Sequence, residues 1–61
     1  MTPRELEVVT YTYRGYSAKK IAETLLVSES TVKAHLTHAY RKLGVHTKQE
    51  LIALVDNYRR H

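Results

Sequence analysis

Apolar residues recur three and four positions apart along much of this chain, which is the spacing of one buried helix face. Two segments show this spacing most clearly, one with Ile21, Ala22 and Leu25 and the other with Leu51, Leu54, Val55 and Tyr58. The pattern predicts an all-α domain of four helices. Their expected ranges are about residues 3–14, 17–25, 28–43 and 47–59.

Capping residues mark the expected ends of these helices. Thr2 and Glu5 have the spacing of a capping box, and Pro3 occupies the first helical position, where its missing N–H costs nothing. Gly15 is expected to end this helix as a C-cap. The other expected caps are Ser17 and Ser28 at helix starts, Gly44 at a helix end, and a second capping box of Thr47 and Glu50.

The predicted helices over 17–25 and 28–43 are separated by only a few residues, which is the arrangement of a helix-turn-helix. Such turns often contain glycine, whereas this chain has Leu26 there. The geometry of the turn therefore stays open at this point. A helix-turn-helix does not by itself establish DNA binding. Whether this chain binds DNA has to be judged from the residues on the exposed face of the longer helix.

The predicted helix over 28–43 divides into two faces at about 100° per residue. Its buried stripe consists of Val32, Leu36, Ala39 and Leu43, with Tyr40 at the edge. Its opposite face consists of Ser30, Ala34, Thr37, His38 and Arg41, with Thr31 and Lys33 on the flanks. No residue of this face is acidic, and the Glu–Lys pairs of an ordinary surface helix are missing. Because Ala34 is small enough for close approach to a base edge, the face predicts a helix in the DNA major groove.

Length and charge agree with a small DNA-binding domain. A chain of 61 residues has no room for a second core. Ten Lys and Arg residues against six Asp and Glu give a net charge of +4, which favours an anionic partner. Charge alone would also fit a solvated basic surface, so its placement matters more. From Ser30 to Gln49 there is no acidic residue at all.

Several other classes of protein are not expected. Without cysteine there is no disulfide and no thiolate zinc site. His35 and His38 lack a neighbouring carboxylate, so no metal or cofactor is expected and His35 is expected to pack between helices. No nucleophile, base and orienting acid form a recognisable set, so the chain is not expected to be an enzyme. Short apolar stretches and the lack of a signal peptide predict a cytoplasmic domain without membrane contact.

Four motifs follow one another in this chain: Thr2 to Glu7, Gly15 to Ala22, Ser28 to His35, and Tyr40 to Val45. Together they cover essentially the whole chain, which resembles the LuxR-type helix-turn-helix domain. The resemblance implies four helices, of which the third reads DNA and the fourth helps the domain to dimerise. It also implies that residues 1–61 form a single domain, the C-terminal output part of a larger bacterial regulator.

The resemblance places Lys33, Ala34 and Thr37 at base-contacting positions. Contacts to the DNA backbone or its flanks are expected from Lys19, Lys20, Ser30, Thr31, His38 and Arg41. The implied partners are double-stranded DNA, a second copy of the chain on DNA, and RNA polymerase, in the bacterial nucleoid. Lys20 departs from the glutamate that the family often has there. Thr37 replaces a basic residue of some members, so the target sequence cannot be carried over from a relative.

The positions of several other side chains follow from the helix faces. Glu5 is expected to be partly buried and to need a cation, which either Arg41 or Lys42 could supply. Two tyrosines are expected in or near the core and two at the surface: Tyr13 and Tyr40, and Tyr11 and Tyr16, respectively.

Two alternative functions remain open. A sigma-factor domain has a similar helix-turn-helix, but His35 and the capped segment over 45–58 are not part of that pattern. A helical protein-interaction module would use Ile52 and Val55 as its contact residues. The same two residues are the expected dimer interface on DNA, because Leu51, Leu54 and Tyr58 are expected in the core.

Overall fold

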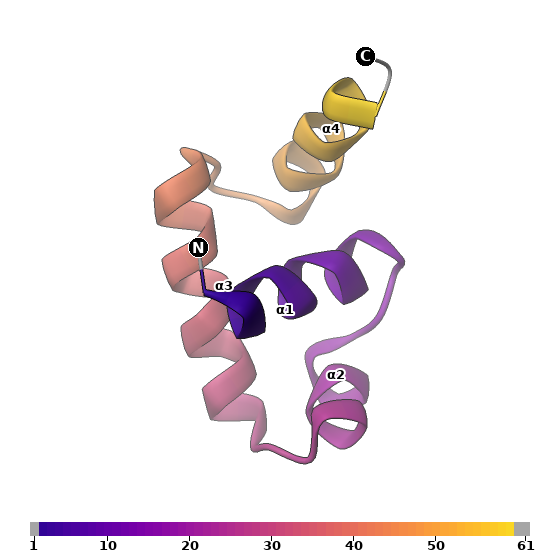
Figure 1. Ribbon diagram of the computed structural model, residues 1–61, viewed down its shortest axis with the longest axis vertical. Helices are drawn as coiled ribbons and strands as arrows, with labels where there is room; N and C mark the ends of the chain where they lie inside the picture. The colour runs from indigo at the N-terminus through magenta and orange to yellow at the C-terminus, as the bar shows by residue number, and fades with distance from the viewer. Residues whose placement is uncertain (1, 60–61) are drawn as a thin grey trace.

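The structure is a computed structural model that describes residues 2–59. It consists of α1 (Pro3–Tyr13), α2 (Ala18–Leu25), α3 (Glu29–Leu43) and α4 (Lys48–Arg59), as Figure 1 shows. Between residues 2 and 59 there is no strand, and the expected all-α fold is confirmed. Each helix agrees with its expected range to within one residue at either end, because the expected ranges included the capping residues.

Side-chain caps fix the helix starts. At α1, the Glu5 N–H donates to Thr2 Oγ1 at 3.2 Å and the Thr2 N–H donates to Glu5 Oε1 at 3.1 Å, so the expected capping box is complete. Ser17 and Ser28 accept backbone N–H bonds at the starts of α2 and α3. At α4 the structure shows one half of the second expected box, in which the Glu50 N–H donates to Thr47 Oγ1 at 3.1 Å.

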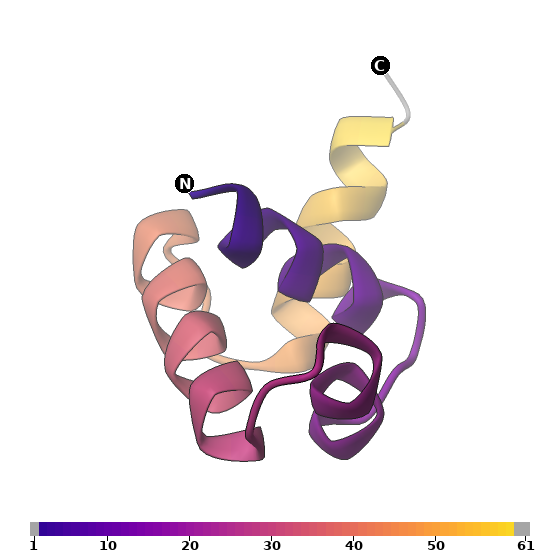
Figure 2. The ribbon, with the colours of Figure 1, turned by 60° about the horizontal axis from the view of Figure 1, so that its bottom comes forward.

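The central helix is α1, which packs against each of the other three. The longest helix, α3, runs along one side of a molecule that measures 33 × 19 × 19 Å (Figures 1 and 2). At one end of the molecule α2 packs against α3, and the two form the expected helix-turn-helix. The opposite end is formed by α4.

The core has two clusters of buried side chains. The cluster near α2 joins α1, α2 and α3 through Val8, Ile21, Ala22 and Val32. The cluster near α4 joins α1, α3 and α4 through Val9, Ala39, Val45 and Leu51. Because α3 contributes to both clusters, it is held along most of its length. Its outward face is therefore presented by a helix with a fixed position.

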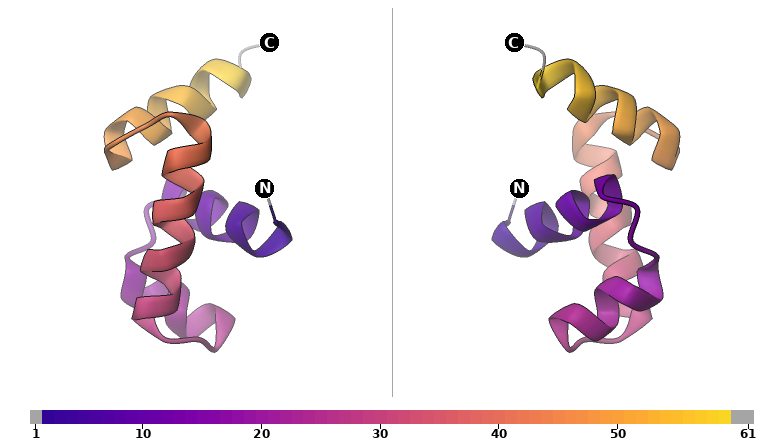
Figure 3. Two further views of the ribbon diagram at one scale, coloured as in Figure 1. Left: turned by 90° about the vertical axis from the view of Figure 1, so that its left-hand side faces the viewer. Right: turned by 90° about the vertical axis from the view of Figure 1, so that its right-hand side faces the viewer.

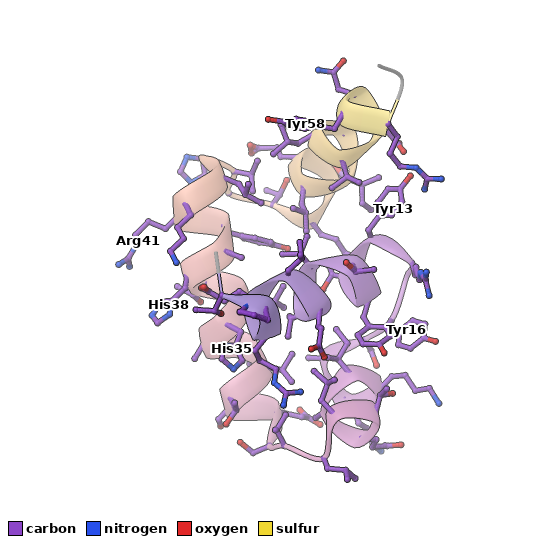
Figure 4. The ribbon with its side chains drawn as sticks, viewed as in Figure 1. Tyr13, Tyr16, His35, His38, Arg41 and Tyr58 are labelled. Atoms are coloured by element: carbon purple, nitrogen blue, oxygen red, sulfur yellow. The ribbon has the colours of Figure 1, made fainter. Side chains whose placement is uncertain are left out.

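Three tyrosines lie elsewhere than the sequence predicts. Tyr58 is 74% exposed and not in the core, because the last turn of α4 extends beyond the other helices (Figures 1 and 4). Tyr11 and Tyr16, expected at the surface, are half-buried against the first cluster and stack on each other, with ring centroids 4.9 Å apart. Tyr13 and Tyr40 are half-buried, as expected.

A polar cluster adds to the contact between α1 and α4. The Tyr13 hydroxyl donates to the Asp56 carboxylate, and the Arg59 guanidinium lies over the Tyr13 ring, 5.7 Å from its centroid. A cation in this position is attracted by the ring face. These contacts add to the packing of Leu54 and Val55 against the second cluster in holding α4 to the domain.

Residues in the left-handed conformation end the first three helices. Gly15, with φ of +93°, follows Arg14, which is the C-cap of α1 in place of the expected glycine. Gly44 caps α3 as expected. Leu26 caps α2 with φ of +59°, although its side chain is 91% exposed. This conformation strains a residue with a Cβ, and the exposed leucine gains little burial in return.

We therefore expect Leu26→Gly to raise the free energy of unfolding by about 0.5–1 kcal/mol, because glycine adopts the left-handed conformation without strain. Urea unfolding of the two proteins measures the difference. Leu26→Ala is the matched control, since alanine must also carry a Cβ into this conformation. Equal stability of the glycine and alanine variants would mean that backbone strain at Leu26 is negligible.

The buried carboxylate of Glu5 forms the ion pair that its burial requires. Lys42 Nζ donates to Glu5 Oε1 at 3.0 Å, whereas Arg41 is exposed and points away from α1 (Figure 4). Of the two expected candidates, Lys42 is therefore the partner. The Thr2 backbone N–H first and the Lys42 ammonium second lower the pKa of Glu5 to about 2. Arg41 consequently stays available on the outward side of α3.

The lowered pKa of Glu5 predicts how stability depends on pH. The contribution of the carboxylate is fully present above its ordinary pKa of 4.5 and is lost as the pH falls toward about 2. Glu5→Gln should therefore lower Tm at pH 7 and reduce the change of Tm between pH 5 and pH 2. Glu7→Gln, in an exposed pair with Arg4, is the control and should follow the wild type. A Glu5→Gln variant with the wild-type pH profile would contradict this role.

Candidate DNA-binding surface

The outward face of α3 is not covered by any described part of the chain (Figure 3, left). Val32 and Ala39 are buried and Leu36, Tyr40 and Leu43 are half-buried, so the expected buried stripe is confirmed. The expected outward residues are exposed, apart from the half-buried Thr31: Ser30, Lys33, Ala34, Thr37, His38 and Arg41. Both faces of α3 thus lie where the periodicity places them.

The hydroxyl groups of this face are only partly free. Thr37 Oγ1 donates to the Lys33 carbonyl at 2.9 Å, which leaves its methyl group and the remaining oxygen lone pair for a partner. Thr31 belongs to the cap of α3, since its N–H donates to Ser28 Oγ at 3.1 Å and the two side-chain oxygens lie 2.9 Å apart. Ser30 is exposed in the same turn. The Thr31 side chain is therefore engaged mainly in capping α3.

The charge on this face is positive. After Glu29 in its first turn, α3 has no acidic residue. Within residues 2–59 the salt bridges join Arg4 to Glu7 and Lys42 to Glu5, so neither Lys33 nor Arg41 is paired. Unpaired cations beside small and hydroxylated side chains form a surface that fits an anionic polymer.

Two further cations lie at the start of α2. Lys19 and Lys20 are exposed in its first turn, which has no acidic residue. Cations are unfavourable at a helix N-terminus because the macrodipole is positive there. Lys20 also occupies the position at which glutamate would complete a capping box with Ser17, whose Oγ accepts the Lys20 N–H at 3.1 Å. Lys19 and Lys20 therefore add positive charge at a helix start where neutral or acidic residues would be more stable.

Comparison with known proteins agrees with this arrangement. Residues 1–55 match the family described as bacterial regulatory proteins, luxR family. The chain belongs to the LuxR family. The resemblance seen in its four motifs is thereby confirmed, and the sigma-factor alternative is set aside. A family of regulatory proteins also agrees with the expectation that the domain is not an enzyme.

Curated relatives of this LuxR-family domain include the oxygen regulatory protein NreC of Staphylococcus aureus. The NreC proteins of strains JH9 and JH1 are each 48% identical over 52 residues, which make up 85% of this chain and 24% of NreC. The chain thus spans about a quarter of the length of these relatives. No solved structure matches it significantly.

The expected contact residues of α4 in this LuxR-family domain are Ile52 and Val55. Both are half-buried, and Val55 packs against the second core cluster. Part of the Val55 side chain is thus used within the domain, whereas Ile52 is not a member of either cluster. Tyr58 adds a large exposed ring near the end of the same helix.

Two histidines of α3 in this LuxR-family domain differ in their exposure. His35 is half-buried, as expected for a residue between helices, and His38 is exposed and points outward (Figure 4). Among residues 2–59 there is no group of three His, Asp or Glu side chains that could hold a metal ion. None of the described helices is long and apolar enough to cross a membrane.

Sequence reasoning missed one feature of this surface. A recess of about 350 Å³ lies at the C-terminal end of α3, and its lining residues are Thr37, Tyr40, Arg41, Gly44, Val45 and His46. Burial raises the pKa of the Tyr40 hydroxyl in its wall. The lack of acidic residues from Ser30 to Gln49 was the only sequence signal for such a place.

Proposed function

We propose that this LuxR-family domain binds double-stranded DNA sequence-specifically, with α3 in the major groove, as the output domain of a bacterial transcription regulator. The observation that carries this proposal is the uncovered, acid-free face of α3, held in place by two core clusters. A rigid helix with small and basic side chains outward is what direct reading of base edges requires.

The side chains divide into two roles. Lys33, Ala34 and Thr37 contact bases, with Lys33 as a donor to guanine and the other two suited to thymine methyl groups. The backbone is contacted by Lys19, Lys20, Ser30 and Arg41, and by Thr31 and His38 on the side of α3 away from Lys33. Phosphates beside Lys19 and Lys20 would relieve the unfavourable charge at the start of α2.

The small size of the domain favours two copies on one DNA site. A single module of this kind buries only about 600–1,000 Å² of its surface on DNA, so tight specific binding calls for paired half-sites about 10 base pairs apart. The second copy would dock through α4, with the exposed part of Ile52 at the centre and Val55 beside it.

The regulator as a whole would extend beyond this domain. The 24% share of NreC that the chain covers supports its being one part of a larger protein. A C-terminal place in that protein is what the resemblance to the LuxR-type domain implies. RNA polymerase is the further partner expected of such an output domain. A domain that binds a protein but no DNA would instead support the alternative of an interaction module.

Lys20→Glu tests the proposed role of the α2 start with two readouts. The substitution completes the capping box and complements the helix dipole, so the free energy of unfolding should rise by about 0.3–1 kcal/mol. DNA affinity should fall, and the slope of log K against log salt should become shallower by at least about 0.9 because one phosphate contact is lost. Urea unfolding and DNA titrations at several salt concentrations measure the two effects.

Arg14→Glu makes the same change in charge at the end of α1, on the side of the domain away from α3 (Figure 1). It should leave the salt slope much closer to that of the wild type. An equal change of slope in both variants would show that Lys20 acts through net charge alone. A wild-type domain that binds no duplex even at low salt would contradict the proposed function itself.

A further inference from the structure

The recess at the end of α3 adjoins the proposed base contacts, because Thr37 forms part of its lining. At about 100° per residue, Tyr40 and Gly44 share the flank of α3 that holds Lys33 and Thr37, and Arg41 lies at the centre of the outward face beside them. The loop between α3 and α4 forms the other wall with Val45 and His46. The recess therefore continues the base-reading side of α3 toward its C-terminal end.

The length of α3 indicates what lies opposite the recess when DNA is bound. With 15 residues, α3 is about 22 Å long, whereas the major groove is about 12 Å wide. If Lys33, Ala34 and Thr37 lie in the groove and the axis of α3 is inclined across it, the last turn after Thr37 reaches past the groove edge. The edge of the groove is a phosphate backbone, so the recess would face a row of phosphates.

The chemistry of the recess fits one phosphate group. Arg41 offers the planar set of N–H donors that binds phosphate oxygens in pairs. Tyr40 beside it on α3 and His46 on the loop also line the recess, and the side chains of both carry a further donor. No acidic residue lines the recess, and the charged residues of the adjoining first turn of α4 are Lys48 and Glu50.

The helix end itself opposes the anion only weakly. A helix C-terminus repels anions because its last carbonyl groups are negative. Here the N–H groups of Gly44 and Val45 donate to the carbonyl groups of Arg41 and Tyr40 at 3.4 Å and 3.0 Å, so part of that negative charge is already satisfied. The positive charge of Arg41 therefore outweighs the remaining negative charge of the helix end, and the recess attracts an anion.

We propose that this recess receives one backbone phosphate of bound double-stranded DNA, held by Arg41 and His46 and oriented by the Tyr40 hydroxyl. The inference rests on the proposed function, because it assumes that α3 lies in the major groove. It adds His46 and Tyr40 to the DNA-binding residues and gives Arg41 a defined partner, a phosphate at the groove edge.

The test uses a duplex selected for tight binding, in which each phosphate of the site is replaced in turn by a neutral methylphosphonate. The wild type and an Arg41→Ala, His46→Ala double variant are titrated with each duplex. We expect one linkage in each half-site whose neutralisation weakens the wild type but not the double variant. The salt slope of the double variant on the unmodified duplex should be shallower by about 0.9 for each bound copy.

Arg14→Ala, which removes one charge from the end of α1, is the control and should keep the wild-type response to every linkage. Unchanged thermal unfolding of the double variant is expected, since Arg41 and His46 are exposed. A double variant that responds to every linkage as the wild type does would overturn the phosphate recess and leave the proposed function standing. Failure of the wild type to bind any duplex would overturn both.

Discussion

Leu51→Ala is expected to lower the free energy of unfolding by about 2–5 kcal/mol. Leu51 has no exposed surface and joins α4 to α1 and α3 through Val9, Ala39 and Val45. Removing its side chain leaves a cavity in one of only two core clusters. A domain of 61 residues has a total stability of only about 3–9 kcal/mol, so much of the variant should be unfolded at 37 °C.

Urea unfolding followed by circular dichroism measures this loss. Leu6→Ala is the matched control, because it removes the same atoms from a leucine of α1 that is 55% exposed. It should cost much less than Leu51→Ala. Similar losses at the two positions would mean that Leu51 does not form the centre of the α4 contact.

Lys33→Ala and Thr37→Ala are each expected to weaken binding to a specific site by about 1–3 kcal/mol, which is roughly a 5- to 150-fold loss of affinity. Both side chains are exposed on the outward face of α3, and neither belongs to a core cluster or a salt bridge of the described residues. Folding should therefore be unaffected. Binding to random DNA should weaken far less, because bases are not read there.

Titration of each variant with a selected site and with random duplex measures the difference. Lys19→Ala is the contrasting variant, since loss of a phosphate contact should weaken both kinds of binding by a similar factor. An equal loss on specific and random DNA for Lys33→Ala would contradict its role as a base-contacting residue.

Most of the fold could be predicted because its signals are local. Ser17, Ser28 and Gly44 start or end helices through bonds within one turn, and the buried stripe of α3 follows from helical periodicity. The face proposed to read DNA follows from the same periodicity. It is the complement of the buried stripe, and the structure exposes it as expected.

The remaining features depend on contacts between distant segments. Periodicity correctly places Tyr58 on the face of Leu51, but it cannot show that α4 extends beyond the core. The choice of Lys42 over Arg41 as partner of Glu5 depends on how α1 crosses α3. The recess arises where the chain turns back after Gly44, so its lining residues could not be assembled from one helix alone.

The proposed function requires that the outward face of α3 reads a DNA sequence. The most direct test is selection of sites bound by the wild-type domain from a pool of random duplex DNA, followed by sequencing. We expect enrichment of one motif, repeated with two-fold symmetry and with half-sites centred about 10 base pairs apart. A selected pool that contains no common motif and binds no better than the starting pool would contradict it.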